Sequence, residues 1–503
     1  MTEQISFGRR AQQWADKHPD KAAIIFYPAD TQQAQEFSWR TVVERSNQIA
    51  RLLAQHGVDE NSSVVIGLPN CPEHYLVSLA IWKLGALAIP LRSKQPRHER
   101  DQILELATPK VVVADWDEPD YTVLNLGDLQ QANHLSAEPL PDIIAQPGKA
   151  IASGGSTGRS KLIVAPAPWV GEEESPIWEY MGFRPQMIHL MCGPLYHNAP
   201  YLFSHRGFFQ GHTLILMERF DAAKAVDLIE RHKVSFAYMA PIMMSRIAKL
   251  PGVEQRNLRS MRTLLHTAAP CPPWLKHAWI NLIGGENLLE LFAATEAVGI
   301  VTIRGDEWLE HEGSVGRPVP GCEMRILDPH GNECPTGDVG EIFMRWTDPD
   351  REPSYSYIGS DPAKSGGDGF SSVGDLGWVD EDGYLFVADR RVDMIISGGA
   401  NVFPAEVEAV LTEHEAIADV AVIGLLDEEW GKRVHAVVQF KDGVEQPDAS
   451  ALNSYCRDRL MVYKVPKSYD FVERLPRNSA GKLRRTALVG DRQAGDSVEL
   501  IWV

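Results

Sequence analysis

The residues best suited to chemistry lie in one stretch, IASGGSTGRSKLIV, at positions 151–164. Its glycines let successive backbone N–H groups converge on an anion, because glycine adopts positive φ at little cost. Hydroxyl groups add donors, and a lysine adds positive charge. The stretch therefore indicates a polyphosphate-binding loop, although a flexible solvated turn has a similar composition. The expected phosphate contacts are Ser153, Ser156, Thr157, Gly158 and Lys161.

The loop is not a Walker loop. That motif requires a Gly-Lys-[Ser/Thr] ending, whereas Gly158 is followed here by Arg159 and Ser160. A kinase-type GxGxxG pattern is also absent from this stretch of the sequence. The loop must therefore belong to another class of nucleotide-binding protein, if it binds phosphate at all.

The surrounding sequence predicts the elements that position this loop. Apolar runs at 22–27, 63–68, 110–115, 213–217 and 234–239 are typical of buried strands. Helical patterns separate them: Val42, Ile49 and Leu53 share one face before Gly57, and an amphipathic stretch covers 221–232. This alternation indicates the α/β class with parallel strand pairing.

Composition limits the classes of function. The chain has 503 residues and a formal net charge of −19, which argues against nucleic acid as the main partner. Its six cysteines are scattered without a CxxC pair, so reduced thiols are expected rather than a zinc site or disulfide framework. The N-terminus lacks a signal-peptide core, and the apolar stretch 76–91 is too short to span a membrane. We expect a cytoplasmic protein without integral membrane association.

A smaller unit follows near the C-terminus. The stretch SYIGSDPAKSGGDGF at 356–370 indicates a loop, and a domain boundary is expected around 389–392. Beyond it the sequence predicts a helix at 404–414, strands at 420–425 and 435–440, and a helix near Leu452. The division predicts a domain of residues 1–389 and another of residues 390–503.

The order of SGGSTGRSK resembles the phosphate loop of the adenylate-forming superfamily, which includes acyl-CoA synthetases, 4-coumarate-CoA ligases, luciferases and adenylation domains. Ser160 replaces the usual proline, and Gly154 replaces a frequent serine. Further motifs follow in the family's order over nearly the whole chain. They are PLYHNAP (194–200), TAAPCP (267–272), ELFAATE (290–296), GSVGRPVPGCEMRI (313–326), VGDLGWVDEDGYLFVADRRVD (373–393), SGGANVFPAEVE (397–408) and NSAGKLRR (478–485).

The resemblance, most marked for acyl-CoA ligases, implies a fold and an ATP site. It implies a large N-terminal domain of layered α/β subdomains and a small mobile C-terminal α+β domain. Glu296 would hold Mg²⁺, Thr295 would reach the α-phosphate, and Asp375 would accept the ribose hydroxyls. Arg390 would contact ribose or phosphate from the hinge. The remaining expected nucleotide contacts are Ala268, Ala269, Pro270, Phe292, Ala293, Ala294 and Val387.

The C-terminal domain would act in both half-reactions of the family. Lys482 resembles the lysine that bridges the reacting carboxylate and the α-phosphate, a task that suits a flexible ammonium. Gly398, Gly399 and Trp430 would contact coenzyme A after a hinge rotation. Many members carry Asp or Lys at the pivot, two residues after the arginine, where this chain has Val392.

The resemblance also places the acyl pocket. His197 is similar to the gate between the carboxylate and the thiol channel, and the other expected lining residues are Asn198, Ala199, Tyr201, Tyr238, Met239 and Met243. Adenylation domains for amino acids usually hold the substrate ammonium with an aspartate in the first segment, which PLYHNAP lacks. A hydrophobic acid is therefore expected, whether bulky and cyclic, aryl or of medium chain length.

The expected activity is ATP- and Mg²⁺-dependent formation of an acyl-adenylate, followed by transfer of the acyl group to coenzyme A. Two alternatives stay open: loading of a separate carrier protein, and nucleotide binding without catalysis. Intact Glu296, Asp375 and Lys482 argue against the second alternative. A homodimer is an expectation from the family alone.

Overall fold

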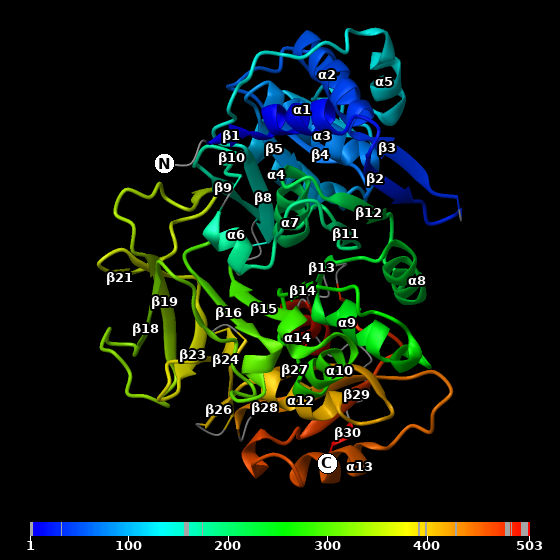
Figure 1. The fold of residues 1–503 in the computed structure, drawn as a ribbon. Coiled ribbons are helices and arrows are strands. Elements are labelled where there is room, and N and C mark those ends of the chain that lie inside the picture. Colours follow the sequence, from blue (N-terminus) through cyan, green and yellow to red (C-terminus); the bar gives the residue numbers. More distant parts are fainter. Residues whose placement is uncertain are drawn as a thin grey trace.

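The computed structural model describes residues 4–31, 33–154, 160–173, 175–390, 393–397, 400–427, 430–477, 483, 485–493 and 501–502. Within these residues the chain forms two large α/β sheets, a smaller β-rich unit and a C-terminal α+β unit (Figure 1). The predicted α/β class with parallel pairing is confirmed, because neighbouring strands at the centre of both large sheets are parallel.

The first sheet runs through the middle of the N-terminal part and ends in antiparallel strands at both edges. Two of the predicted strands, at 22–27 and 213–217, have the expected bounds. In spatial order its strands are β17 (Arg317–Pro318), β16 (Ile300–Arg304), β15 (Leu288–Ala293), β14 (Thr263–His266), β13 (Phe236–Met239), β11 (Ile188–Met191), β12 (Thr213–Met217), β2 (Ala22–Tyr27) and β3 (Gln35–Ser38).

The second sheet carries the glycine-rich stretch on one of its hairpins. Its strands, in spatial order, are β20 (Ser356–Ile358), β9 (Ser160–Ala165), β8 (Lys149–Gly154), β5 (Leu87–Pro90), β4 (Ser63–Gly67), β6 (Val111–Ala114) and β7 (Val123–Leu124). A short separate pair joins β1 (Ile5–Ser6) to β10 (Val170–Gly171).

Apolar side chains hold these sheets in layers with helices. The largest core joins both sheets through the helices between them, α1 (Phe7–Lys17), α2 (Trp39–Gln55) and α3 (Pro72–Lys83), with one face of α7 (Asn198–Phe209). The outer face of the first sheet packs on α8 (Ala222–His232), α9 (Pro241–Ala248) and α10 (Pro273–Ile283). The outer face of the second sheet packs on α4 (Arg97–Ala107). Two sheets and three helical layers therefore form one continuous body.

The helix boundaries follow local chemistry. Ser38 caps α2, where its hydroxyl accepts from the Thr41 N–H at 3.2 Å, and Gly57 takes a φ of +80° just after the helix ends. The predicted apolar face of α2 is buried, including Val42, Ile49 and Leu53. The short helices α5 (Leu126–Gln131), α6 (Pro176–Tyr180) and α11 (Gly305–Trp308) complete this part.

The expectation of a loop at 356–370 is wrong. Ser356–Ile358 forms β20, which pairs with β9 in the second sheet, and Lys364–Gly367 forms β21. Glycine, serine and aspartate are rare in strands, but β20 is fixed as an edge strand by a partner distant in sequence, and β21 by a hairpin with β22. β21 belongs to the β-rich unit with β22 (Phe370–Ser372), β19 (Gly340–Trp346), β18 (Cys322–Leu327), β23 (Asp375–Val379) and β24 (Leu385–Arg390).

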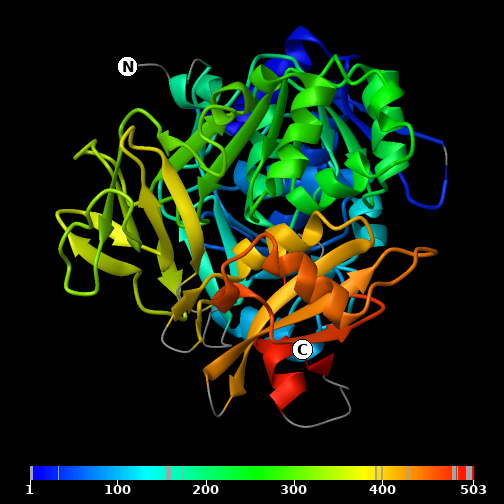
Figure 2. The same cartoon turned by 90° about the horizontal axis from the view of Figure 1, so that it is seen from below.

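The C-terminal unit is a mixed sheet with helices, seen from below in Figure 2 in orange and red. The boundary around 389–392 stays a prediction; β24 ends at Arg390, and a separate apolar core begins at Ile395. Lys249, which caps α9, donates to the Ala418 carbonyl at 3.3 Å and so joins this unit to the N-terminal part. The elements of the C-terminal unit are β25 (Ile395–Ser397), β26 (Ala400–Val402), α12 (Pro404–Thr412), β27 (Ile417–Asp427), β28 (Gly431–Phe440), α13 (Ala449–Arg457), β29 (Ser468–Phe471), α14 (Arg485–Gln493) and β30 (Ile501–Trp502).

All six cysteines are free thiols, as expected. No helix in the described part of the chain has both the length and the apolarity needed to cross a bilayer. The cytoplasmic location stays a prediction.

Gly316 lies in close contact with the backbone of the first sheet, so a substitution there tests the packing between this sheet and the β-rich unit. Its φ is +102°, and an added Cβ would lie 1.9 Å from the Thr302 carbonyl oxygen in β16. We expect Gly316→Ala to lower the free energy of unfolding by about 3 kcal/mol or more, because left-handed strain adds to a backbone clash. Urea unfolding followed by tryptophan fluorescence measures the change.

Gly331→Ala is the matched control, since Gly331 has a φ of +88° and open space around its Cβ position. Strain alone should cost it about 1 kcal/mol. Equal effects of the two substitutions would contradict the packing argument.

Candidate active site

The glycine-rich stretch forms the end of the β8–β9 hairpin. Ser153 lies opposite Lys161 and Gly154 lies opposite Ser160, so the segment between them is the turn. Ser156, Thr157 and Gly158 belong to that turn and lie outside the described residues. The hairpin therefore carries the predicted loop at the edge of the second sheet, with Lys161 at its base.

Lys161 reaches the first sheet through Glu296. The Lys161 ammonium lies 3.3 Å from Glu296 Oε1, and both side chains are largely buried, at 19% and 9% exposed. Tyr357 in β20 donates to the same oxygen at 2.6 Å, and the Lys161 ammonium lies 3.7 Å from the centre of its ring. Burial and the Glu296 carboxylate raise the pKa of Tyr357, so the phenol stays protonated as a donor. The cluster joins β9, β20 and the segment after β15.

A tight turn presents Glu296. Thr295 is partly exposed beside it, and Ala297 adopts a φ of +48° while its N–H donates to the Ala294 carbonyl. The Trp346 indole N–H donates to the Ala297 carbonyl at 2.8 Å and holds this turn. A single buried carboxylate with exchangeable cationic and phenolic partners suits Mg²⁺, which takes one or two carboxylates together with phosphate oxygens. The residues present therefore fit the predicted metal.

Tyr357 was not predicted as a site residue. Tyr357→Phe removes one of the two groups holding Glu296, and we expect the apparent affinity for Mg²⁺ in ATP–pyrophosphate exchange to fall about tenfold or more. Titrating Mg²⁺ at saturating ATP measures it. Tyr355→Phe is the matched control, since the Tyr355 hydroxyl accepts from the Ala363 N–H and its ring lies 4.9 Å from that of Tyr357. An unchanged Mg²⁺ requirement in Tyr357→Phe would show that the phenol only fills space.

The predicted adenine and ribose contacts lie at the ends of neighbouring strands. β14 ends at His266, and Ala268 follows with a φ of +81°, a strained value for a residue with a side chain. Ala269 and Pro270 continue this turn. Phe292 and Val387 pack in one apolar cluster, and Ala293 borders another.

Asp375 begins β23, is 9% exposed, and lies opposite Arg390 of β24. The register supports the expected proximity of these two residues, which come from the two sides of the predicted hinge. Their roles toward ribose stay predictions.

The structure divides the predicted acyl-pocket residues among four places. Ala199 and Tyr238 share an apolar cluster with Phe203, Leu265 and Leu291. Tyr201 is fully buried in the largest core, where its hydroxyl donates to Ser78 Oγ at 3.0 Å.

Met239 and Met243 pack instead on the outer face of the first sheet, with α8 to α10. Adjacent strand residues point to opposite faces, so Tyr238 and Met239 cannot line one pocket from β13. The alternation was available from the sequence. The structure does not bring Met239, Met243 and Tyr201 to the cluster around Tyr238.

His197 stands immediately before α7, and its ring lies 4.3 Å from that of Tyr196. Asn198 is the first residue of the helix. Its carboxamide oxygen accepts a hydrogen bond from Lys149, the buried first residue of β8. The gate role of His197 stays a prediction, and Lys149 was not identified from the sequence.

The predicted catalytic lysine, Lys482, lies outside the described residues, as do Val392, Gly398 and Gly399. The residues flanking its segment are placed: Arg477 and Leu483 form an antiparallel bridge, and the Arg477 guanidinium contacts Asp419 Oδ2 at 2.6 Å. Trp430 donates its backbone N–H to Asp427, and the Lys467 ammonium lies 3.7 Å from its ring centre. Its coenzyme A contact stays a prediction.

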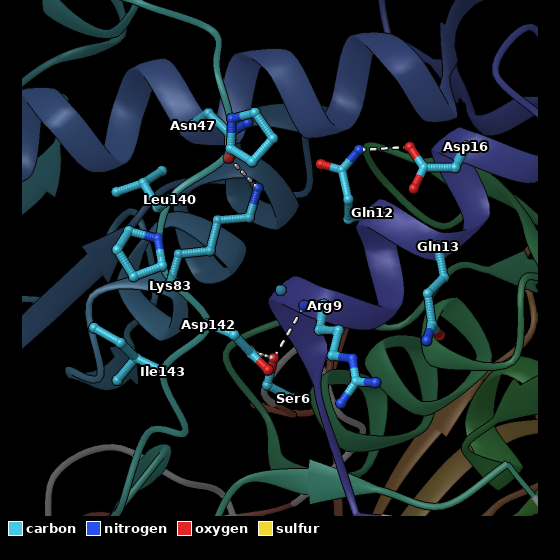
Figure 3. A pocket seen from close by; sticks show the side chains of 13 residues that line it. Ser6, Arg9, Gln12, Gln13, Asp16, Asn47, Lys83, Leu140, Asp142 and Ile143 are labelled. Carbon is cyan, nitrogen blue, oxygen red and sulfur yellow. Dashed lines mark hydrogen bonds between the residues drawn. The ribbon is translucent and has the colours of Figure 1, made fainter.

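A separate cavity of about 310 Å³ lies among α1, α2, α3 and residues 139–143 (Figure 3). Lys83 crosses its floor and donates to Ser46 Oγ at 2.7 Å and Asn47 Oδ1 at 2.6 Å. Arg9 and Asp142 contribute to its walls, and no predicted site residue lines it. The cavity is thus distinct from the Glu296 cluster.

The chain is similar to known proteins over most of its length. Residues 11–347 match the family model of the AMP-binding enzyme, and residues 406–482 match that of the AMP-binding enzyme C-terminal domain. A 2-succinylbenzoate–CoA ligase of Bacillus pumilus is 30% identical over 480 residues, covering 93% of this chain and 95% of that protein. A fatty acid–[acyl-carrier-protein] ligase of Streptomyces coeruleorubidus is 28% identical, covering 94% and 95%.

Solved structures of related enzymes have the same fold as this chain. The o-succinylbenzoate CoA synthetase of Bacillus subtilis, in complex with its acyl-adenylate intermediate, has a TM-score of 0.80 at 26% identity, covering 97% of this chain and 98% of that one. The same enzyme with ATP and magnesium ion has a TM-score of 0.79 at 26% identity, covering 97% and 100%. The chain therefore belongs to the AMP-binding enzyme family, within the adenylate-forming superfamily, and is an AMP-forming acyl-CoA synthetase.

Proposed function

We propose that the chain converts a hydrophobic carboxylic acid, bulky and cyclic, aryl or of medium chain length, to its coenzyme A thioester at the expense of ATP. The observation that carries the proposal is the Lys161–Glu296–Tyr357 cluster beside partly exposed Thr295. This cluster supports the proposal because the Glu296 carboxylate, which would hold the metal, and the Lys161 ammonium, which would hold the phosphates, both lie at the base of the glycine-rich hairpin. The acid would contact the apolar cluster around Tyr238 and Ala199.

The first half-reaction joins a carboxylate oxygen of the acid to the α-phosphorus of ATP and breaks the bond to pyrophosphate. Lys161 and the hairpin N–H groups would hold the β- and γ-phosphates, Thr295 would donate to the α-phosphate, and Lys482 would bridge the two reactants. Mg²⁺, when held by Glu296, supplies charge neutralisation at the phosphates. Asp375 would orient the ribose. The glycine N–H groups and these side chains thus lower the repulsion between two anions.

In the second half-reaction the thiol sulfur of coenzyme A attacks the acyl carbon, the thiol proton leaves, and the bond to AMP breaks. The C-terminal unit would rotate to present Gly398, Gly399 and Trp430. The contact between Lys249 and Ala418 is a single bond across the interface at that point, which such a rotation could exchange at small cost.

The relatives support aryl acids among these substrates, since several are 2-succinylbenzoate–CoA ligases. The Streptomyces relative acts on an acyl-carrier protein, which favours carrier loading as the second candidate. A non-catalytic relative would have little need of a buried carboxylate with a cation and a phenol on one oxygen.

Mass spectrometry tests the proposal. The protein is incubated with Mg-ATP and a mixed panel of aliphatic, aryl and polycyclic acids, with and without coenzyme A. New acyl-CoA masses support the ligase and name the acid class. Acyl-adenylates that coenzyme A leaves unchanged would replace it with carrier loading, and nucleotide binding without ATP consumption for any acid would overturn it.

A further inference from the structure

Lys149 is a buried cation that contacts the first residue of α7. It begins β8, is 6% exposed, and donates to Asn198 Oδ1, while its ammonium lies 5.7 Å from the centre of the Trp169 ring. No carboxylate among the described residues forms an ion pair with it. Burial alone lowers the pKa of its ammonium, to about 7, with no neighbouring acid to oppose that shift.

Such an arrangement is costly for folding alone. A buried charge without a counter-ion loses hydration that one amide oxygen and one ring face restore only in part. Lys276 has Glu290 as its partner and Arg100 has Glu118, whereas buried Lys83 is held by two side-chain oxygens, of Ser46 and Asn47. Lys149 has one side-chain oxygen, that of Asn198, so an incoming anionic oxygen would supply a second partner.

Asn198 connects Lys149 to the acyl cluster. On α7, Tyr201 and His205 face the largest core, whereas Ala199, Leu202 and Phe203 face the cluster around Tyr238. Asn198 is four residues before Leu202 and seven before His205, so it lies at the border of these two faces. Lys149 holds the carboxamide oxygen from the core side.

The carboxamide has its oxygen and its NH₂ on opposite sides, so fixing one directs the other. With its oxygen held by Lys149, Asn198 has its NH₂ left to donate to a ligand. Asn198 is also at the first turn of α7, where backbone N–H groups lack intrahelical partners. All of these groups are hydrogen-bond donors, which suits an oxygen acceptor.

We propose that Lys149 and Asn198 form a specificity site for a second oxygen-bearing group of the acid, with a second carboxylate as the preferred ligand. Lys149 acts as a positioning residue that orients Asn198 and supplies positive charge, and Asn198 contacts the substrate. The inference rests on the proposed function and narrows its substrate class to acids with an oxygen acceptor remote from the reacting carboxylate.

The test compares three acids of one skeleton: 4-phenylbutanoate, 4-oxo-4-phenylbutanoate and 2-succinylbenzoate, which add first a ketone and then a second carboxylate. We expect the KM of the native enzyme to fall along this series, by about 10- to 100-fold for the charged group, the scale of a hydrogen bond to an ion. A larger gain from the ketone than from the carboxylate would assign the site to a neutral acceptor and overturn the preference for an anion.

Two variants localise the effect. Asn198→Asp keeps an acceptor for Lys149 but replaces the NH₂ donor by a negative charge, and Lys149→Met removes the cation at similar length. Within each variant, KM for 2-succinylbenzoate should rise about 10-fold or more relative to KM for 4-phenylbutanoate, which carries no second oxygen-bearing group. A purely structural role would change both acids alike, and that result would overturn the inference.

Asn198→Asp carries the test if Lys149→Met does not fold, because its buried pair stays complete. Failure of the proposed function is distinguishable: no acid of the series would then be activated by the native enzyme. Activation of all three acids with equal KM would leave the ligase proposal standing and overturn the specificity site.

Discussion

Lys482→Ala is expected to suppress ATP–pyrophosphate exchange by about 100-fold or more, the scale of removing one donor that stabilises transition-state charge. The reason is electrostatic: two anions must meet, and the ammonium would be the group that contacts both of them. Formation of the thioester from a supplied acyl-adenylate and coenzyme A should fall much less. In that step AMP is the leaving group, so no carboxylate has to approach the negatively charged α-phosphate.

Lys432→Ala is the matched control, since Lys432 is an exposed lysine of the same unit and coenzyme A takes no part in the exchange reaction. It should leave the exchange rate within about 2-fold of native, as expected for an exposed side chain remote from the chemistry. Normal exchange by Lys482→Ala would remove that residue from the mechanism. Equal loss in both half-reactions would indicate damage to the whole C-terminal unit.

The residues that flank position 482 are anchored to the rest of the C-terminal unit. Arg477 contacts Asp419 Oδ2 at 2.6 Å and Oδ1 at 2.8 Å, and pairs with Leu483 on the other side of the segment. Arg485 contacts Glu408 through two hydrogen bonds of 2.7 and 2.9 Å. Bidentate pairs of this kind fix direction as well as distance. Because Arg477, Leu483 and Arg485 make these contacts, we expect Lys482→Ala to leave them in place.

Buried strands were the most predictable part of the fold. Ala22–Tyr27 and Thr213–Met217 are continuous apolar runs inside parallel sheets, where both faces are covered and local composition decides the outcome. Ser356–Ile358 was not predictable in this way, because this edge strand is fixed by its distant partner β9. Lys364–Gly367 pairs with neighbouring β22 across Asp368 and Gly369, so its signal was a short hairpin turn rather than an apolar run. Sequence periodicity carries no information about such partners.

The same distinction applies to the site. Glu296 and Lys161 belong to motifs that occur in the family's order along the sequence, and in the structure their side chains lie 3.3 Å apart. Tyr357 was missed because its strand was expected to be a loop. Lys149 was missed because a single lysine at the start of a strand is usually solvated, and only the fold shows it buried. The acyl-pocket set stays a prediction, but Tyr238 and Met239 lie on opposite faces of β13 and so in different apolar clusters.

Loss of stability in mild acid is the second large effect expected of this chain. Six histidines have fully buried side chains, and burial lowers the pKa of each: to about 3 for His74, His205 and His435, to about 4 for His212, and well below the ordinary range for His189 and His266. The unfolded chain binds a proton at each with a pKa of about 6.5.

The unfolded state therefore binds more protons than the native state below about pH 6.5, so acid favours unfolding. Each histidine costs about 1.4 kcal/mol per pH unit, so six cost about 8 kcal/mol at pH 5.5, which is comparable to the whole stability of a typical domain. Their contribution to stability is present above the unfolded pKa and is lost as the pH falls toward the folded values.

Buried thiols have the opposite effect on the pH dependence of stability, since they destabilise the native state in alkali. Burial raises the pKa of Cys192 to about 12 and of Cys456 to about 11, whereas thiols in the unfolded chain ionise near pH 8.5. Stability is lost as the pH rises past that value. Buried Lys83 and Lys149, with pKa values lowered to about 7, become less costly as the pH rises above 7. Above pH 8.5 these two lysines gain about as much stability per pH unit as the two thiols lose, so stability is expected to rise up to about pH 8.5 and to change little from there to about pH 9.5.

Urea midpoints measured from pH 5 to pH 9.5 test this profile, and one substitution tests its cause. Neither ring nitrogen of His189 has a hydrogen-bond partner among the described residues, and its ring packs 4.6 Å from that of Phe236. His189→Leu should flatten the acid limb by about one proton without losing a hydrogen bond, which is about 1.4 kcal/mol at pH 5.5. His56→Leu, which removes an exposed imidazole, is the matched control. A midpoint constant from pH 7.5 to 5.5 would mean that the buried imidazoles gain protons as readily as the unfolded chain does, and that protons reach the core without unfolding it.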